Sequence, residues 1–163
     1  MHLKIFLKTV FLVLLFLPPI LIANVVRPAP NFTWQNAEHS TSTLHSISGR
    51  SVILIVTPDV RNPKFRRQIH ELQGVYQALS ASRVLPFVAF TQSPGRIPSN
   101  VPYIVVSNGP RVASSYGMWN SFGIAIIGRD GNLDYISNKV VAGQRALDII
   151  RNSFAVQQAL RRD

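Results

Sequence analysis

Two short apolar runs on either side of one amphipathic segment constrain the fold of this chain more than any other feature. Residues 51–56 are SVILIV and residues 84–90 are VLPFVAF, which is the length and apolar content of strands buried on both faces. Asn62-Pro63 between them is typical of a helix start, with asparagine as the N-cap and proline in the first turn. The apolar residues that follow recur on one helical face: Phe65, Ile69, Leu72, Tyr76 and Leu79. The order strand, helix, strand predicts a parallel pair of strands with a right-handed crossover.

The second half of the chain adds short elements to this unit. Residues 91–100 are rich in turn formers and predict a loop, whereas Asp130-Gly131 between two apolar runs predicts a β-hairpin. The expected elements are a strand over 103–106, a helix over 110–116, strands over 122–127 and 133–136, and a helix from 140 to about 154. We therefore expect an α/β fold in which helices cover both faces of a mixed sheet, a three-layer α/β/α sandwich.

An apolar segment precedes the predicted domain. Lys4 and Lys8 lie before an uncharged run over residues 9–26. This plan is typical of a signal peptide, and the run is also long enough for a membrane anchor, so both alternatives stay open for residues 1–26. In either case the lysines favour an N-terminus inside and a domain outside the cytoplasm. This predicts an exported protein, periplasmic or extracellular, or anchored in the inner membrane.

The remaining domain boundaries follow from composition. Residues 27–46 contain Pro28, Pro30 and a polar tract, which predicts a flexible linker. Residues 47–155 form the predicted domain. Residues 156–163 are expected to be a polar tail that frays.

The charge of the chain points to anionic partners. Seventeen lysine and arginine residues against seven acidic ones give a net charge of +10. A basic surface favours an acidic protein surface, a small anion or lipid headgroups. Nucleic acid is disfavoured as a partner, because export removes the protein from most of it and the basic residues are not interleaved with aromatic ones.

The chain contains no cysteine. This excludes disulfides, thiolate catalysis and cysteine-ligated metals. The four histidines show no helical metal-ligand spacing within the predicted domain, and no HExxH, phosphate-loop or GxGxxG pattern occurs. We therefore expect neither a metal nor a cofactor.

Three neighbouring segments carry a resemblance to a known superfamily. Tyr116-Gly-Met118, the run 122–127 and Gly128-Arg-Asp-Gly131 resemble a stretch of thioredoxins and peroxiredoxins. The chain looks most similar to an uncharacterised bacterial thioredoxin-like group, domain of unknown function 4174. This closer likeness covers about residues 47–152 and is carried by 52–58, 66–68 and 122–131, with Arg129 in place of a lysine. It implies the thioredoxin fold.

The same resemblance implies that the redox site has been replaced. Redox thioredoxins carry a Cys-x-x-Cys motif after the first core strand, where this chain has TPDVRNP over residues 57–63. They carry a cis-proline before the third core strand, where this chain has Ser121-Phe122. Since a thiolate is the nucleophile in disulfide exchange, we expect no oxidoreductase activity.

The region that replaces the redox site is the predicted binding surface. Several cations crowd a helix start, where free backbone N–H groups and positive side chains together favour an anion. The predicted binding residues come from this loop and helix start and from the turn of the missing proline: Thr57, Asp59, Arg61, Lys64, Arg66, Arg67, Ser121 and Phe122. We therefore expect a non-catalytic binding or interaction module with a basic contact surface.

Two alternatives remain open on the sequence. One is a cysteine-free enzyme of unknown type in the same cleft, with His70 as a base beside Thr57, or with Asp59 and Glu71 as a carboxyl pair. The other is a structural protein whose basic surface lies on a membrane.

Overall fold

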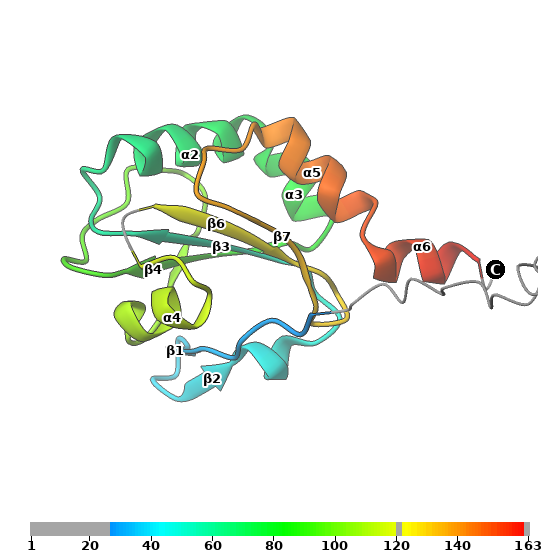
Figure 1. Ribbon diagram of the computed structural model, residues 1–163, viewed down its shortest axis with the longest axis horizontal. Helices are drawn as coiled ribbons and strands as arrows, with labels where there is room; N and C mark the ends of the chain where they lie inside the picture. Colours follow the sequence, from blue (N-terminus) through cyan, green and yellow to red (C-terminus); the bar gives the residue numbers. More distant parts are fainter. Residues whose placement is uncertain (1–26, 120–121, 162–163) are drawn as a thin grey trace, which may run out of the picture.

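A computed structural model describes residues 27–119 and 122–161 (Figure 1). Its main sheet has five strands: β3 (Val52–Thr57), β4 (Leu85–Phe90), β5 (Ile104–Val105), β6 (Gly123–Ile127) and β7 (Leu133–Ser137). They lie in the order β5-β4-β3-β6-β7. β3 and β4 pair in parallel, as the strand–helix–strand pattern predicts, and β6 and β7 pair antiparallel as a hairpin. The mixed sheet is thereby confirmed, whereas the signal or anchor prediction for residues 1–26 lies outside the described residues.

β3 lies at the centre of the sheet and separates two cores. All six of its residues are buried. Because side chains alternate along a strand, Leu54 and Val56 pack into one core, and Ile53 and Ile55 pack into the other. A strand that is apolar on both faces requires a covering layer on each side of the sheet.

Three helices cover the face of Ile53 and Ile55: α2 (Pro63–Gly74), α3 (Tyr76–Ala81) and α5 (Gly143–Arg151) (Figure 1). The predicted helical stripe from Phe65 to Leu79 is divided between α2 and α3. Glycine is a weak helix former, and after Gly74 the backbone of Val75 leaves the helix at φ −116° and ψ 12°. Four residues of the stripe still pack on one core: Phe65, Ile69, Leu72 and Leu79.

A buried amide fixes α2 to the loop before α5. The Gln68 side chain donates from Nε2 to the Val141 carbonyl oxygen at 2.9 Å and accepts from the Val141 N–H at 2.7 Å. One turn later, the Glu71 carboxylate accepts from the Gly143 N–H at 3.1 Å. A side chain at Gly143 would overlap the Glu71 carbonyl oxygen, so only glycine permits this approach. These contacts hold residues 138–143 against α2.

The other face of the sheet is covered by α4 (Gly109–Ser115) and by the segment predicted to be a linker (Figure 1). The flexible-linker prediction for 27–46 is wrong, because this segment forms β1 (Thr33–Gln35), β2 (Thr41–Thr43) and most of η1 (Leu44–Ile47). Phe32 and Trp34 are 3% and 5% exposed and pack on Phe87, with ring centroids 5.2 and 4.7 Å from that ring. Two large rings at alternating positions supply the buried area that anchors this polar segment.

The C-terminal part also differs from its prediction. A single helix over 140–154 and a polar tail over 156–163 are predicted, but α5 ends at Arg151 and a second helix, α6 (Phe154–Leu160), follows it. Ser153 between them is extended, at φ −60° and ψ 153°, and interrupts the helix. α6 extends away from the sheet (Figure 1), and Leu160 is 67% exposed. Within residues 27–119 and 122–161, no helix combines the length and apolarity of a membrane span.

Candidate functional site

The predicted binding surface lies at the carboxyl ends of β3 and β4. The loop after β3 leads directly into α2. Val56 pairs with Gly123, so Phe122 lies beside the end of β3, as the resemblance implies. Ser121 lies outside the described residues.

Two of the predicted residues are buried and serve the fold. Thr57 has no exposed surface, and its Oγ1 donates to the Asp59 carbonyl oxygen at 3.0 Å. Phe122 is 2% exposed and belongs to the core that contains Phe65 and Phe90. Neither side chain can contact a ligand without unpacking, so their assignment to the contact surface is wrong.

Side chains of the loop after β3 accept hydrogen bonds from the backbone N–H groups at the start of α2. The Asp59 Oδ1 accepts from the N–H groups of Arg61 and Asn62 at 2.7 and 3.1 Å. The Asn62 Oδ1 then accepts from the N–H groups of Lys64 and Phe65 at 3.0 and 3.1 Å. Pro63 has no N–H, so the donors that usually bind an anion at a helix start are occupied. An anion at this surface must therefore be bound by side chains.

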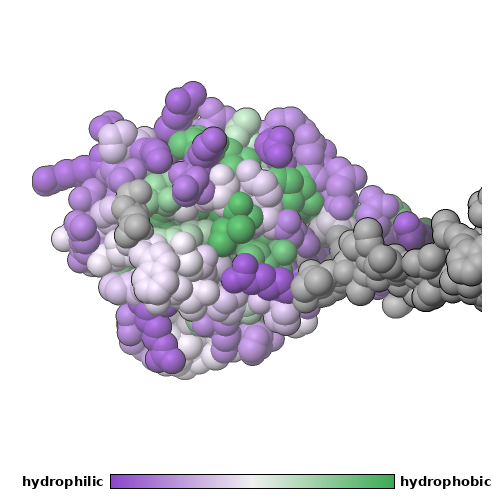
Figure 2. Space-filling view, viewed as in Figure 1, coloured by the Kyte–Doolittle hydropathy of each residue, from purple (hydrophilic) through white to green (hydrophobic). Residues whose placement is uncertain are grey.

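Cationic side chains from two distant segments line one groove beside α2. Lys64 and Arg67 come from α2, and Lys139 comes from the loop between β7 and α5. We call this the basic groove; its lining is completed by Pro63, Glu71, Val140 and Ala142. The Lys64 Nζ lies 3.4 Å from the Asn138 carbonyl oxygen, which ties the two walls together. In Figure 2, hydrophilic residues project along the outer edge of the helix layer that contains α2, with apolar residues visible between them.

Lys139 is the groove residue that sequence reasoning missed. Seventy-five positions separate it from Lys64 (139 − 64), and no local pattern links the two. Tertiary contacts bring its loop to α2, above all the two buried hydrogen bonds between Gln68 and Val141. Conversely, Arg61 and Arg66 are exposed but do not line the groove.

The two pairs of side chains considered for an enzyme are not arranged to act together. The Thr57 hydroxyl already donates within its own loop, while His70 is exposed on α2. The Asp59 carboxylate caps its loop, and the Glu71 carboxylate accepts from Gly143. Among the described residues, no group of three His, Asp or Glu side chains could hold a metal ion.

One carboxyl group elsewhere has a clearly shifted pKa. Burial, with a smaller contribution from the nearby Asp130, raises the pKa of Asp134 to about 6. One oxygen of Asp134 is buried without a hydrogen-bond partner. Asp134 lies in β7 and borders Gly128, at the end of the sheet away from the basic groove.

Solved structures with the same arrangement of elements identify the fold. The mitochondrial 2-Cys peroxiredoxin of Plasmodium falciparum matches with a TM-score of 0.60 and 21% identity, over 83% of this chain and 96% of that one. A thiol:disulfide interchange protein from Bacteroides sp. matches with a TM-score of 0.61 and 13% identity, over 80% and 90%. The thioredoxin domain of a thiol-disulfide oxidoreductase from Bacteroides vulgatus matches with a TM-score of 0.56 and 14% identity, over 77% and 95%. The fold is thioredoxin-like.

At these identities the likeness concerns the thioredoxin-like fold alone. No family model matches the sequence, and no curated protein matches it. The resemblance to domain of unknown function 4174 therefore stays a prediction. The names of the neighbours refer to thiol–disulfide and peroxiredoxin proteins, whereas this thioredoxin-like chain contains no cysteine.

Proposed function

We propose that the protein is an exported thioredoxin-like binding module without redox activity, which contacts an anionic partner through the basic groove. The convergence of Lys64, Arg67 and Lys139 on one groove is the observation that carries the proposal. The partner chemistry that fits is a carboxylate-rich protein segment. We also infer that the protein belongs with the domain of unknown function 4174 group.

The absence of thiols supports the non-redox part of the proposal. Disulfide exchange proceeds by thiolate attack on a disulfide sulfur, and hydroxyl or carboxyl groups do not replace a thiolate in this reaction. The chain has no cysteine, and TPDVRNP over residues 57–63 runs from the last residue of β3 to the first residue of α2. The fold is therefore retained while the chemistry of its neighbours is lost.

The electrostatics of the basic groove support an acidic partner. Its three cations face a single acid, Glu71, whose carboxylate already accepts from the Gly143 N–H. Exposed ion pairs contribute about 0.2–1 kcal/mol each and are screened by salt, so we expect modest and salt-sensitive affinity. Such surfaces act on association rate and partner choice more than on tight binding.

Export and attachment belong to the same proposal. Lys4 and Lys8 before the uncharged run 9–26 favour insertion with the N-terminus inside. If the run is retained, it would anchor the domain on the outer side of a membrane. If it is cleaved, the domain would be released. Exposure of the groove outside the cytoplasm would give it acidic proteins of the envelope as partners.

Binding of an acidic probe tests the groove. The full chain, in an uncharged detergent, is titrated into a fluorescent oligoglutamate peptide and followed by fluorescence anisotropy. The triple variant Lys64→Gln, Arg67→Gln and Lys139→Gln is expected to raise Kd roughly tenfold, from about 0.5 kcal/mol per lost pair.

A charge-matched control separates the groove from net charge. Arg96→Gln, Arg111→Gln and Arg151→Gln remove the same charge from exposed residues outside the groove, in the loop after β4, on α4 and at the end of α5. This control is expected to retain the wild-type Kd. Equal losses in both triple variants would show that overall charge alone binds the peptide, which contradicts the proposal.

A further inference from the structure

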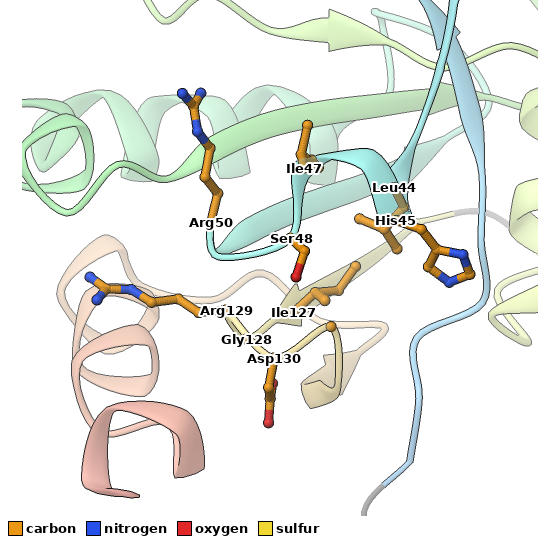
Figure 3. A pocket seen from close by; sticks show the side chains of 10 residues that line it. Leu44, His45, Ile47, Ser48, Arg50, Ile127, Gly128, Arg129 and Asp130 are labelled. Atoms are coloured by element: carbon orange, nitrogen blue, oxygen red, sulfur yellow. The ribbon is translucent and has the colours of Figure 1, made fainter. Parts of the chain in front are cut away.

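A small hollow lies at the end of the sheet opposite the basic groove. It is enclosed by η1, the residues before β3 and the β6–β7 turn (Figure 3). We call it the end pocket. Its apolar wall contains Leu44, Ile47 and Ile127, and its polar rim is formed by His45, Ser48, Arg50, Arg129 and Asp130. Figure 3 shows the Arg50 and Arg129 side chains extending outward on the same side of the pocket.

Backbone hydrogen bonds bring three arginines to this end. The Gly49 N–H donates to the Arg129 carbonyl oxygen at 2.9 Å, which places Arg50 beside the turn. The Leu133 N–H donates to the Arg27 carbonyl oxygen at 2.8 Å, which ties Arg27 to the same hairpin. All three arginines are exposed.

The two acidic residues at this end are hydrogen-bonded or partly buried. The Asp130 carboxylate accepts from the backbone N–H and side-chain amide of Asn132, at 3.1 and 2.6 Å. Asp134, half-buried in β7, borders the same turn. Arg83, two residues before β4, adds another cation, since Leu85 pairs with Val52 at this end. These four arginines outnumber the two acids, so the net charge of this end is positive.

Sheet register fixes the end pocket relative to the basic groove. Val52 pairs with Ile127 and Val56 with Gly123, so the β6–β7 turn lies at the amino end of β3, whereas α2 starts beyond its carboxyl end. A strand of this length spans about 17–20 Å. The two sites therefore face opposite ends of the domain.

The chain enters the domain at the end that carries the pocket. The uncharged run 9–26 is followed immediately by Arg27, and Arg27 is already hydrogen-bonded to the hairpin. No spacer separates the run from the domain. If the run lies in a bilayer, the end pocket must come within reach of the lipid headgroups.

We propose that the end pocket docks on the membrane surface, where Arg50 and Arg129 bind the phosphates of anionic lipid headgroups. The proposal rests on the membrane attachment proposed above. Docking would orient the domain with the basic groove directed away from the bilayer, toward partners. Arginine suits this role because its planar guanidinium binds phosphate through paired N–H groups.

The absence of native cysteine allows a direct test. Ser48→Cys, at the rim of the end pocket, or Ser93→Cys, in the loop after β4, gives the full chain one thiol for a fluorophore. Each chain is reconstituted into nanodiscs whose lipids carry a nitroxide quencher on the headgroup. The lipid is phosphatidylcholine alone, or phosphatidylcholine mixed equimolar with phosphatidylglycerol. We expect the Ser48 probe to be quenched more strongly in the anionic discs than in the phosphatidylcholine discs, and the Ser93 probe to be quenched in neither.

Arginine variants test the residues that the proposal names. Each arginine near an anionic surface contributes about a fivefold factor to such an equilibrium, so Arg50→Gln with Arg129→Gln should lower the docked-to-undocked ratio roughly 25-fold. The matched pair Arg61→Gln with Arg96→Gln, from the loops at the opposite end, should leave it unchanged. Equal quenching in both lipids, an unaffected Arg50/Arg129 variant, or equal quenching of both probes would overturn the proposal.

The outcomes separate this inference from the proposals on which it stands. A chain that does not remain with phosphatidylcholine discs overturns the membrane attachment and the docking with it. A chain that remains with the discs but shows no lipid-dependent quenching overturns the docking alone. Oligoglutamate binding measures the basic groove independently of both.

Discussion

Gln68 shows how one buried side chain builds the basic groove. It is fully buried and makes both of its hydrogen bonds to the backbone of Val141. Leucine has a similar shape but would leave the Val141 N–H and C=O buried without partners, each at a cost of about 1–3 kcal/mol. The extra apolar surface of leucine offsets about 1 kcal/mol of this loss. We therefore expect Gln68→Leu to lower the free energy of unfolding by about 2–4 kcal/mol.

Urea denaturation followed by far-UV circular dichroism measures this loss. Gln73→Leu is the matched control, because Gln73 is exposed on the same helix and its change should stay within about 0.5 kcal/mol. Since Lys139 lies two residues before Val141, Gln68→Leu should also weaken oligoglutamate binding. A Gln68→Leu protein as stable as the Gln73→Leu control would refute the argument that these two bonds hold the loop on α2.

Four further predictions concern the core, the turn and the lost chemistry. Trp34→Ala should lower the free energy of unfolding by about 3–5 kcal/mol in urea denaturation, because Trp34 packs on Phe87; a flexible linker would show no loss. Gly109→Ala should cost more than about 2 kcal/mol in the same assay, because its Cβ would overlap the Phe90 carbonyl oxygen, whereas Gly74→Ala, with open space, should not destabilise. The pKa of Asp134 is raised to about 6, so the folded state retains a proton that the unfolded state releases from roughly pH 4 upward. Stability should therefore fall by about 1 kcal/mol as pH rises through this window, after allowance for solvent screening, and Asp134→Asn should remove the change. In an insulin-reduction assay the protein should show no turnover above background, because it has no thiol.

The central unit of the fold was predictable because its signals are local and repeated. The runs 51–56 and 84–90 and the Asn62-Pro63 start correspond to β3, β4 and α2 in the structure. The strands of the N-terminal segment could not be predicted from its sequence. Only Phe32 and Trp34 show the alternating apolar pattern of a strand, and the residues around them are prolines and polar residues. What holds it is contact with Phe87, which no pattern in its own residues reveals.

The position of the candidate site was predictable from the sequence, but the residues that line it were not. The resemblance to redox thioredoxins predicts a site in the loop after β3, but it does not show which side chains point inward, and Thr57 and Phe122 are buried. The helix start predicts an anion bound by free backbone N–H groups, but the side chains of Asp59 and Asn62 accept from these N–H groups. Lys139 joins the groove through a tertiary contact, which sequence spacing cannot supply.

Mapping the oligoglutamate contact by NMR tests the central claim most directly. Amide resonances of the full chain would be compared with and without the peptide. The account predicts that the shifted resonances cluster at residues 63–71 and 138–142, which contain the basic groove. Shifts confined to other surfaces, or spread evenly over the basic residues, would contradict it.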